Sequence, residues 1–203
     1  MVDHNPAEFE VKLFHVGLSD DLGELLRSDV SAHRCWCMWF IDSVKDFHAA
    51  GSDGNRARFE ALARGTAEPM GLLAYCAGKP VAWCAVGPKE RFARAMRTPT
   101  LRGYVSPQKA TWLVPCFYVH PGHRRSGVTK LLLERAVSLA AGHGAEFVAG
   151  FPAAGSRPAT SGDRQVGAEG VFASQGFVAV HRPSGSRVVM QRAVGGTSDE
   201  GSH

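Results

Sequence analysis

The segment from Cys116 to Glu134 reads Cys-Phe-Tyr-Val-His-Pro-Gly-His-Arg-Arg-Ser-Gly-Val-Thr-Lys-Leu-Leu-Leu-Glu. It continues an apolar run that begins at Leu113, passes through a short basic loop and enters a stretch with helical periodicity. We therefore expect a strand that turns sharply into a helix. Such a turn directs unpaired backbone N–H groups and the positive end of the helix dipole at one point, which predicts an anion site.

The side chains around this turn favour the same interpretation. Arg124, Arg125 and Lys130 add positive charge, and Gly127 has no Cβ, so the backbone can approach a phosphate closely there. Apolar residues then recur at the spacing of one helix face, as a helix packed on a sheet requires. These residues are Val128, Leu131, Leu132, Ala136 and Leu139.

The loop also resembles a known family motif. Arg124-Arg-Ser-Gly127-Val-Thr129 is similar to the Arg/Gln-x-x-Gly-x-Gly/Ala loop of the GNAT superfamily, the acetyl-CoA-dependent N-acetyltransferases. Val119-His120-Pro121 resembles the Val-x-Pro that ends the family's central strand, and Gly176-Phe177 resembles the Gly-Phe that enters its sixth strand. One departure is Thr129, where the family has Gly or Ala. The Cys-Trp-Cys-Met-Trp segment at 35–39 is similar to that of one GNAT subgroup.

The order of predicted elements is similar to that of the GNAT fold over roughly Glu10 to Ala193. The resemblance implies an α/β fold, a GNAT-like mixed and mostly antiparallel central sheet flanked by helices on both faces. We expect one N-acetyltransferase domain at 9–194, between an N-terminal tail at 1–8 and a disordered tail at 195–203. The expected strands are 9–16, 71–76, 80–86, 113–119, 146–151, 177–181 and 187–192, and the expected helices are 19–27, 42–50, 55–64, 89–96, 128–143 and 169–175.

The resemblance further implies how the cosubstrate acetyl-CoA would bind. GNAT enzymes hold the pantetheine arm like an added strand, and their central strand splays to admit it. Backbone groups of Phe117 and Val119 would hydrogen-bond this arm. The pyrophosphate would lie against Arg124, Arg125, Ser126, Gly127, Val128 and Thr129. The alternative is an ordinary strand-to-helix turn with solvated arginines.

Both residues that the family often uses for proton transfer are missing. A Glu base is often found at the position of Leu113, and a Tyr acid at the position of Phe172. Tyr118, His120 and Glu169 remain as candidates, with structural alternatives as a core aromatic, a solvated imidazole and a charge that complements a helix dipole. Catalysis without a dedicated base also stays open, because holding the reactants together lowers the barrier by itself.

The segment His33-x-Cys35-x-Cys37 places metal-capable side chains close together. Zinc sites normally use wider cysteine spacing and a fourth ligand, so we expect no metal and interpret the thiols as packed. The cysteines are odd in number, which favours free thiols in a reducing cytoplasm. Trp36 and Trp39 are expected mainly in the core, and secondarily as a wall of the substrate pocket.

Composition sets limits on the other classes of function. The chain has 203 residues, of which 44% are hydrophobic, enough for one substantial core. No apolar run reaches transmembrane length and the start is unlike a signal peptide, so we expect a cytoplasmic protein with no membrane partner. The net charge of +4 is too diffuse to predict nucleic-acid binding. Monomer and homodimer both stay open.

Together these features predict an N-acetyltransferase that moves an acetyl group from acetyl-CoA to a primary amine by direct attack in a ternary complex. The amine acceptor would be a small molecule or a protein lysine or N-terminus. The missing Glu and Tyr motivate an alternative, a catalytically weak acyl-CoA-binding or regulatory module.

Overall fold

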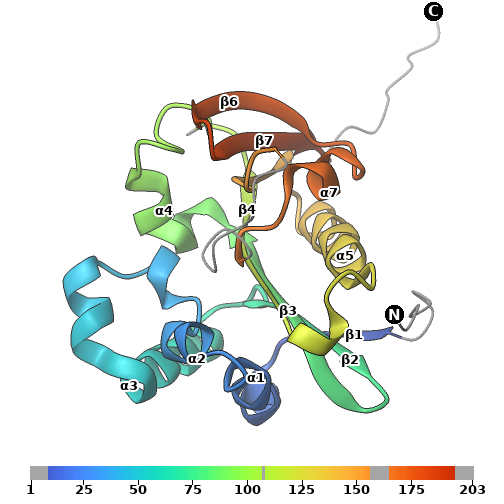
Figure 1. Ribbon diagram of the computed structural model, residues 1–203. Coiled ribbons are helices and arrows are strands. Elements are labelled where there is room, and N and C mark those ends of the chain that lie inside the picture. The colour runs from blue at the N-terminus through green and yellow to red at the C-terminus, as the bar shows by residue number, and fades with distance from the viewer. Residues whose placement is uncertain (1–8, 107, 156–164, 195–203) are drawn as a thin grey trace, which may run out of the picture.

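A computed structural model describes residues 9–106, 108–155 and 165–194 (Figure 1). The predicted tails at 1–8 and 195–203 lie outside the described residues. Seven strands form one sheet in the order β1-β2-β3-β4-β5-β7-β6. They are β1 (Phe9–Leu13), β2 (Gly71–Cys76), β3 (Lys79–Pro88), β4 (Thr111–Val119), β5 (Phe147–Gly150), β6 (Val178–Ser184) and β7 (Arg187–Ala193).

Helices lie on both faces of this sheet, and β4–β5 is the parallel pair among otherwise antiparallel neighbours. The predicted mixed and mostly antiparallel α/β fold is therefore confirmed. The helices are α1 (Ser19–Leu26), α2 (Val30–Cys35), α3 (Val44–Gly65), α4 (Ala93–Arg97), α5 (Val128–Gly142) and α7 (Glu169–Ala173). Short 3₁₀ turns are η2 (Val16–Leu18), η3 (Met38–Phe40), η4 (Lys89–Phe92) and η5 (Pro121–His123).

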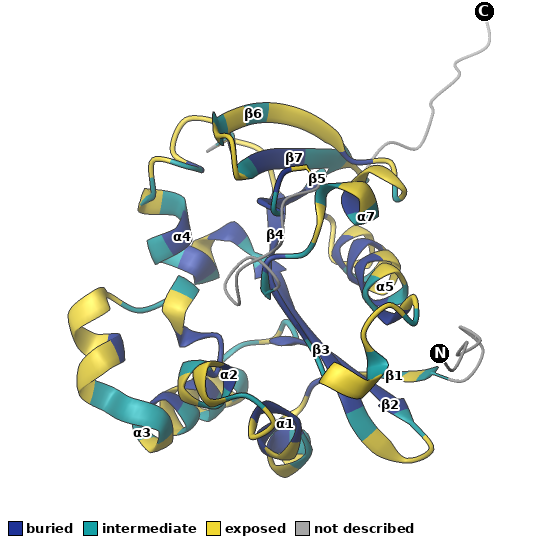
Figure 2. Ribbon diagram, in the orientation of Figure 1, coloured by how far each residue is buried: buried dark blue, intermediate teal, exposed yellow. Residues whose placement is uncertain are grey.

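The core is divided between the two faces of the sheet. On one face α5 packs through Val128, Leu132 and Ala136 against β2, β3 and β4. On the other face α1, α2 and α3 cover β2 and β3, while α4 and the residues around it cover β4, β5 and β7. Figure 2 shows that β3 and β4 are buried along most of their length. These two strands are therefore apolar on both sides, as expected for strands that are covered on both faces.

The hairpin from β2 to β3 follows from its turn residues. Ala77 and Gly78 both have positive φ values, 49° and 76°. A tight two-residue hairpin turn needs positive φ at its central positions, which matches the right-handed twist of the strands.

The helices predicted at 42–50 and 55–64 meet at a kink. α3 consists of two helical segments divided at Gly51, whose backbone is non-helical (φ 64°, ψ −166°), and the second segment begins earlier than predicted. Ser52 donates a hydrogen bond to the carbonyl of His33 at 3.1 Å, and buried Asn55 donates to the carbonyl of Arg34 at 2.9 Å. Ser52, which lies between the two predicted helices, and Asn55, which begins the second, thus anchor the kinked helix to α2. No helix in the described ranges is long and apolar enough to cross a bilayer.

Candidate active site

β4 and β5 are paired only at their beginnings. The parallel ladder joins Thr111–Leu113 to Phe147–Ala149, and β5 ends at Gly150. Within the described residues, the remainder of β4 has a strand partner on its β3 side alone. The backbone groups on its other edge are therefore available to an extended ligand that adds to the sheet.

A β-bulge marks the point where β4 leaves β5. The register between β3 and β4 shifts after Ala85, so that β4 carries an extra residue. Pro115, which has no N–H group, lies in this part of the strand. Beyond it Phe117 packs in the core beneath α5, whereas Cys116 and Tyr118 pack on the opposite face. The bulge therefore bends the strand and redirects its side chains.

The loop after β4 ends at the N-terminus of α5. Arg125 and Gly127 have positive φ values of 64° and 84°, and Gly127 is the N-cap residue. The first backbone bond of the helix runs from the N–H of Leu131 to the carbonyl of Gly127. The N–H groups of Val128–Lys130 thus have no acceptor within the helix, and no described side chain caps it. This end of α5 can accept an anion.

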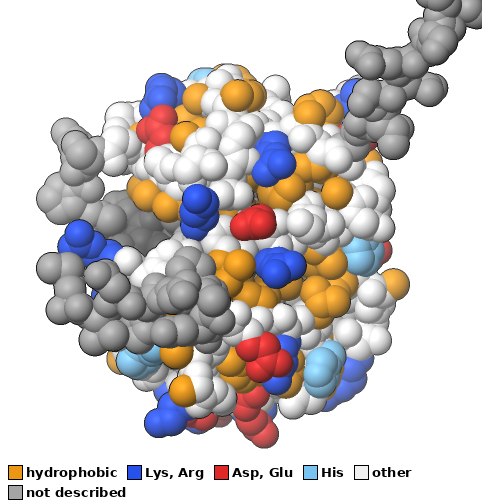
Figure 3. Space-filling view, turned by 90° about the vertical axis from the view of Figure 1, so that its right-hand side faces the viewer, with side chains coloured by type: hydrophobic (Ala, Val, Ile, Leu, Met, Phe, Trp, Pro, Cys, Tyr) orange, Lys and Arg blue, Asp and Glu red, His pale blue; other side chains and the backbone are white. Residues whose placement is uncertain are grey.

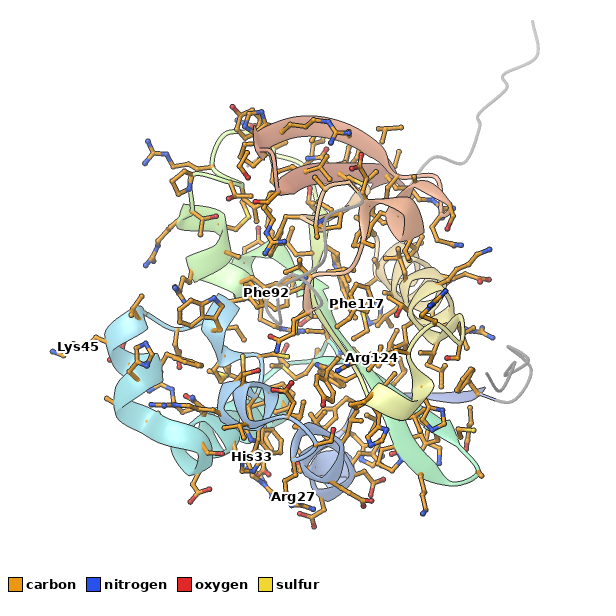
Figure 4. All side chains as sticks on the ribbon, in the orientation of Figure 1. Arg27, His33, Lys45, Phe92, Phe117 and Arg124 are labelled. Carbon is orange, nitrogen blue, oxygen red and sulfur yellow. The ribbon has the colours of Figure 1, made fainter. Side chains whose placement is uncertain are left out.

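Residues 124–129, which are predicted to surround the pyrophosphate, lie together in this loop and the first turn of α5. Arg124 and Arg125 are exposed, as is Lys130 nearby. The Ser126 hydroxyl donates to the carbonyl of His123 at 2.6 Å, which holds the loop's shape. Figure 4 shows Arg124 at the start of α5 and Phe117 farther back along β4. The open edge of β4 and the anion-binding turn therefore form one continuous path.

Tyr118 is the first of the three candidates for proton transfer. Its side chain is buried, and its hydroxyl lies 2.6 Å from that of Ser28. The Ser28 hydroxyl donates to the carbonyl of Leu25, so Tyr118 must be the donor in the pair. Burial raises the pKa of Tyr118, and the phenol is protonated near neutral pH. Tyr118 and Cys116 line a small cavity together with Gln165.

His120 and Glu169 have structural contacts. The Nδ1 atom of His120 accepts a hydrogen bond from the N–H of Gly122 at 3.2 Å and so caps η5. Glu169 forms an ion pair with Arg182 and accepts from the N–H of Gly155 at 3.2 Å. Arg182 is the main reason that the pKa of Glu169 lies below its ordinary value. A carboxylate held in this way is a poor general base.

The positions that usually carry Glu and Tyr are apolar and buried in this protein. Leu113 and Phe172 have no measurable exposure, and the ring of Phe172 packs 6.2 Å from that of Phe117.

The sequence did not single out Asp29, the N-cap of α2, whose Oδ1 accepts from the N–H of Ser31 at 2.9 Å.

The two tryptophans separate in space. Trp36 is 2% exposed and packs in the core against Phe59, whereas Trp39 is 37% exposed and lines a pocket of about 270 Å³. Trp36 and Cys37 adopt consecutive positive φ values of 44° and 58°, and this tight turn directs Trp36 inward. Only Trp39 therefore lies where it could contact a substrate.

All five cysteines are free. The sulfur of Cys37 accepts a hydrogen bond from Trp83 Nε1 at 3.1 Å, and burial raises the pKa of Cys35 to about 12. No cluster of His, Cys, Asp or Glu with the geometry of a metal site occurs among the described residues.

A larger groove of about 630 Å³ lies away from this site, between β1 and α5. Its lining is mainly aliphatic. Figure 3 views the molecule from the α5 side and shows hydrophobic side chains interspersed with Lys and Arg. The groove lacks the convergent polar groups of an active site.

Comparison with known proteins identifies the family of this protein, whose site combines the open edge of β4 with the uncapped N-terminus of α5. The sequence model described as "Acetyltransferase (GNAT) family" matches residues 36–159, more than half of the chain. The chain therefore belongs to the GNAT acetyltransferase family and is an acyltransferase. No curated protein sequence matches it significantly.

Solved structures share the fold at low sequence identity. PaiA N-acetyltransferase from Thermoplasma acidophilum, in complex with coenzyme A, is 13% identical with a TM-score of 0.53, covering 91% of this chain and 98% of that one. YncA from Salmonella typhimurium, with its cofactor acetyl-CoA, is 16% identical with a TM-score of 0.55, covering 94% and 96%. A GNAT acetyltransferase from Streptococcus pneumoniae is 14% identical with a TM-score of 0.54, covering 93% and 100%.

Proposed function

We propose that this protein transfers the acetyl group of acetyl-CoA to a primary amine by direct attack in a ternary complex. The observation that carries this proposal is the open edge of β4, which leads directly to the uncapped N-terminus of α5. The pantetheine arm of acetyl-CoA, an extended chain with amide groups, matches the open edge of β4. The pyrophosphate joined to it matches the N-terminus of α5. The structures of PaiA with coenzyme A and of YncA with acetyl-CoA support the same ligand by analogy of fold.

Acetyl-CoA would lie with its pantetheine arm along β4. The backbone groups of Phe117 and Val119 would hydrogen-bond this arm, and residues 124–129 would surround the pyrophosphate. A Cβ added at Gly127 would meet no described atom within 4 Å, so the space beside this residue is open to a ligand. Thr129, which replaces the family's Gly or Ala, is half-buried in the first turn of α5.

The reaction follows from the groups around the path. The amine attacks the thioester carbon, and backbone N–H groups of β4 stabilise the negative charge on the oxygen. Because Leu113 provides no carboxylate, the amine would lose its proton to water. The C–S bond then breaks, the departing thiolate takes a proton from Tyr118, and the phenolate left behind regains a proton from water. The buried phenol is protonated near neutral pH and therefore has a proton to give.

An alternative is a catalytically weak acyl-CoA-binding or regulatory module. It is favoured by the burial of Leu113 and Phe172, which leaves both usual proton-transfer positions apolar. In either case we propose that the protein acts in the cytoplasm, as a monomer or homodimer, without a metal. The acceptor would be a small molecule or a protein lysine or N-terminus.

Release of coenzyme A distinguishes the two functions. The protein would be incubated with acetyl-CoA and a panel of amines and peptides, with mass-spectrometric detection of acetylated products. Acetyl-CoA affinity would be measured in parallel by calorimetry. Product formation at many turnovers supports the enzyme, whereas tight binding without any acetylated product contradicts it and supports the module.

A further inference from the structure

The pocket that contains Trp39 has a distinct chemical character. It lies where η3, α4 and the end of β5 meet, and its volume is about 270 Å³. Aromatic rings and cations supply much of its wall, and none of its described lining residues is acidic. The lining includes Trp39, Phe40, Arg94, Thr100, Phe151 and Arg187.

Arg94 makes two contacts with Trp39 at this wall. Its guanidinium carbon lies 3.5 Å from the centre of the Trp39 ring, and its Nη1 donates to the carbonyl of Trp39 at 2.7 Å. This stacking leaves the edge of the planar guanidinium for other partners. Within the described part of the chain, no second acceptor and no carboxylate contacts Arg94.

Burial lowers the pKa of Arg94, as expected for a cation that is partly desolvated without a carboxylate partner. Arg187, which comes from β7, adds a second positive charge to the same wall. A guanidinium that is already oriented and partly dehydrated binds a planar carboxylate well, because the fork of N–H groups matches the two oxygens.

The pocket is next to the proposed reaction centre. Gln165 lines this pocket and also the small cavity that contains Cys116 and Tyr118. Phe151 directly follows β5, at the point where β5 has separated from β4. A molecule in the pocket could therefore extend an amine toward the thioester on β4.

We propose that the acceptor is a small primary amine that also carries a carboxylate, and that Arg94 binds this carboxylate in the Trp39 pocket. This inference rests on the proposed acetyl transfer at the same site. The apolar walls at Phe40 and Phe151 suit a ring or aliphatic body between the amine and the carboxylate.

The binding of two probes of nearly the same shape tests the pocket without any turnover. The probes are 4-methylbenzoate and 4-methylbenzamide, which differ in charge but hardly in size. We expect the benzoate to bind about tenfold more tightly, because a charge-assisted bond to Arg94 forms only with the anion. Nuclear magnetic resonance would follow the indole N–H signal of Trp39, which the benzoate should shift.

The Arg94→Gln variant should lose this preference, so that the two probes bind equally. Arg64→Gln is the matched control, since it removes the same charge from an exposed position at the end of α3. Equal binding of the probes to the wild type, no binding of either, or an unchanged preference in Arg94→Gln would overturn the proposal. The Trp39 signal in the wild type decides the question even if Arg94→Gln does not fold.

Measurements of turnover distinguish a failure of this inference from a failure of the proposed function. The amines 4-(aminomethyl)benzoate and 4-(aminomethyl)benzamide would be compared by kcat/KM. Preference for the carboxylate by about tenfold is the expected result. Equal acetylation of both amines contradicts the carboxylate site but leaves acetyl transfer intact. Benzoate binding at Trp39 with no acetylation of any amine contradicts the proposed function instead.

Discussion

The hydroxyl of Tyr118 on β4 donates a hydrogen bond to the hydroxyl of Ser28, which follows α1, over 2.6 Å. This contact joins the strand proposed to bind acetyl-CoA to the helices on the acceptor side. It also orients the only hydroxyl among the three candidate residues Tyr118, His120 and Glu169. A buried phenol held at this position can protonate a departing thiolate when its hydrogen turns from Ser28 to the sulfur.

Replacing Tyr118 by Phe tests this role. We expect kcat to fall by about 100-fold, because a general acid typically contributes this much or more, while the acetyl-CoA dissociation constant stays unchanged. Loss of the Ser28 contact should cost about 1 kcal/mol of unfolding free energy. Steady-state kinetics and calorimetry on the same preparation provide both readouts.

Tyr75→Phe is the control for this variant. Tyr75 packs in the same cluster, and its hydroxyl donates to Asp21 at 2.6 Å, away from the open edge of β4. It should lose stability but keep its kcat. A Tyr118→Phe enzyme with the kcat of Tyr75→Phe would show that Tyr118 is only a core residue.

Glu169→Gln should keep full turnover, because Glu169 is engaged by Arg182. The pKa of Glu169 is lowered in the folded state, so its contribution to stability is present above its ordinary value of about 4.3. It is lost as the pH falls through the lower, folded-state pKa. The variant should therefore be about 0.5 kcal/mol less stable near neutral pH, and equal to the wild type in strong acid. Urea unfolding at several pH values measures this, and a large loss of kcat would restore Glu169 as a base.

Cys116→Ala should retain most of its turnover. Cys116 is buried, and contact with Cys37 together with burial raises its pKa well above the ordinary value, so it is a poor nucleophile. Direct attack in a ternary complex predicts intersecting lines in initial-rate plots. Parallel lines, with an acetyl group trapped on Cys116 in the absence of acceptor, would establish a covalent intermediate instead.

Protein purified without chelator should contain much less than stoichiometric zinc. The sulfur of Cys37 already accepts from Trp83, and neither it nor Cys35 belongs to a metal-like cluster among the residues described. Elemental analysis measures the metal content directly. Tightly held zinc in a one-to-one ratio with the chain would contradict the packed-thiol interpretation.

Much of the fold was predictable because its signals are local. The loop from Arg124 to Gly127 lies between a strand and a helix whose apolar spacings are visible in the sequence, and both elements occur where expected. The hairpin of β2 and β3 follows from its own turn residues. In contrast, α2 has only six residues, too few for a periodic pattern to emerge.

The features that give the candidate site its chemistry depend on distant parts of the chain. Arg94 stacks on Trp39 across 55 residues, and Ser28 meets Tyr118 across 90. No local pattern encodes these contacts. Trp36 and Trp39 were grouped as neighbours in sequence, yet positive φ values at Trp36 and Cys37 reverse the chain and send one ring into the core.

The central claim is that acetyl-CoA binds along β4 with its pyrophosphate at the N-terminus of α5. Gly127→Glu tests it most directly. The new carboxylate would lie in the space proposed for the pyrophosphate, and the positive φ of 84° would add local strain. Calorimetry on the folded variant, verified by circular dichroism, should show at least about a 100-fold loss of acetyl-CoA affinity, since like charges are forced together. An unchanged dissociation constant in a folded Gly127→Glu protein would contradict the account.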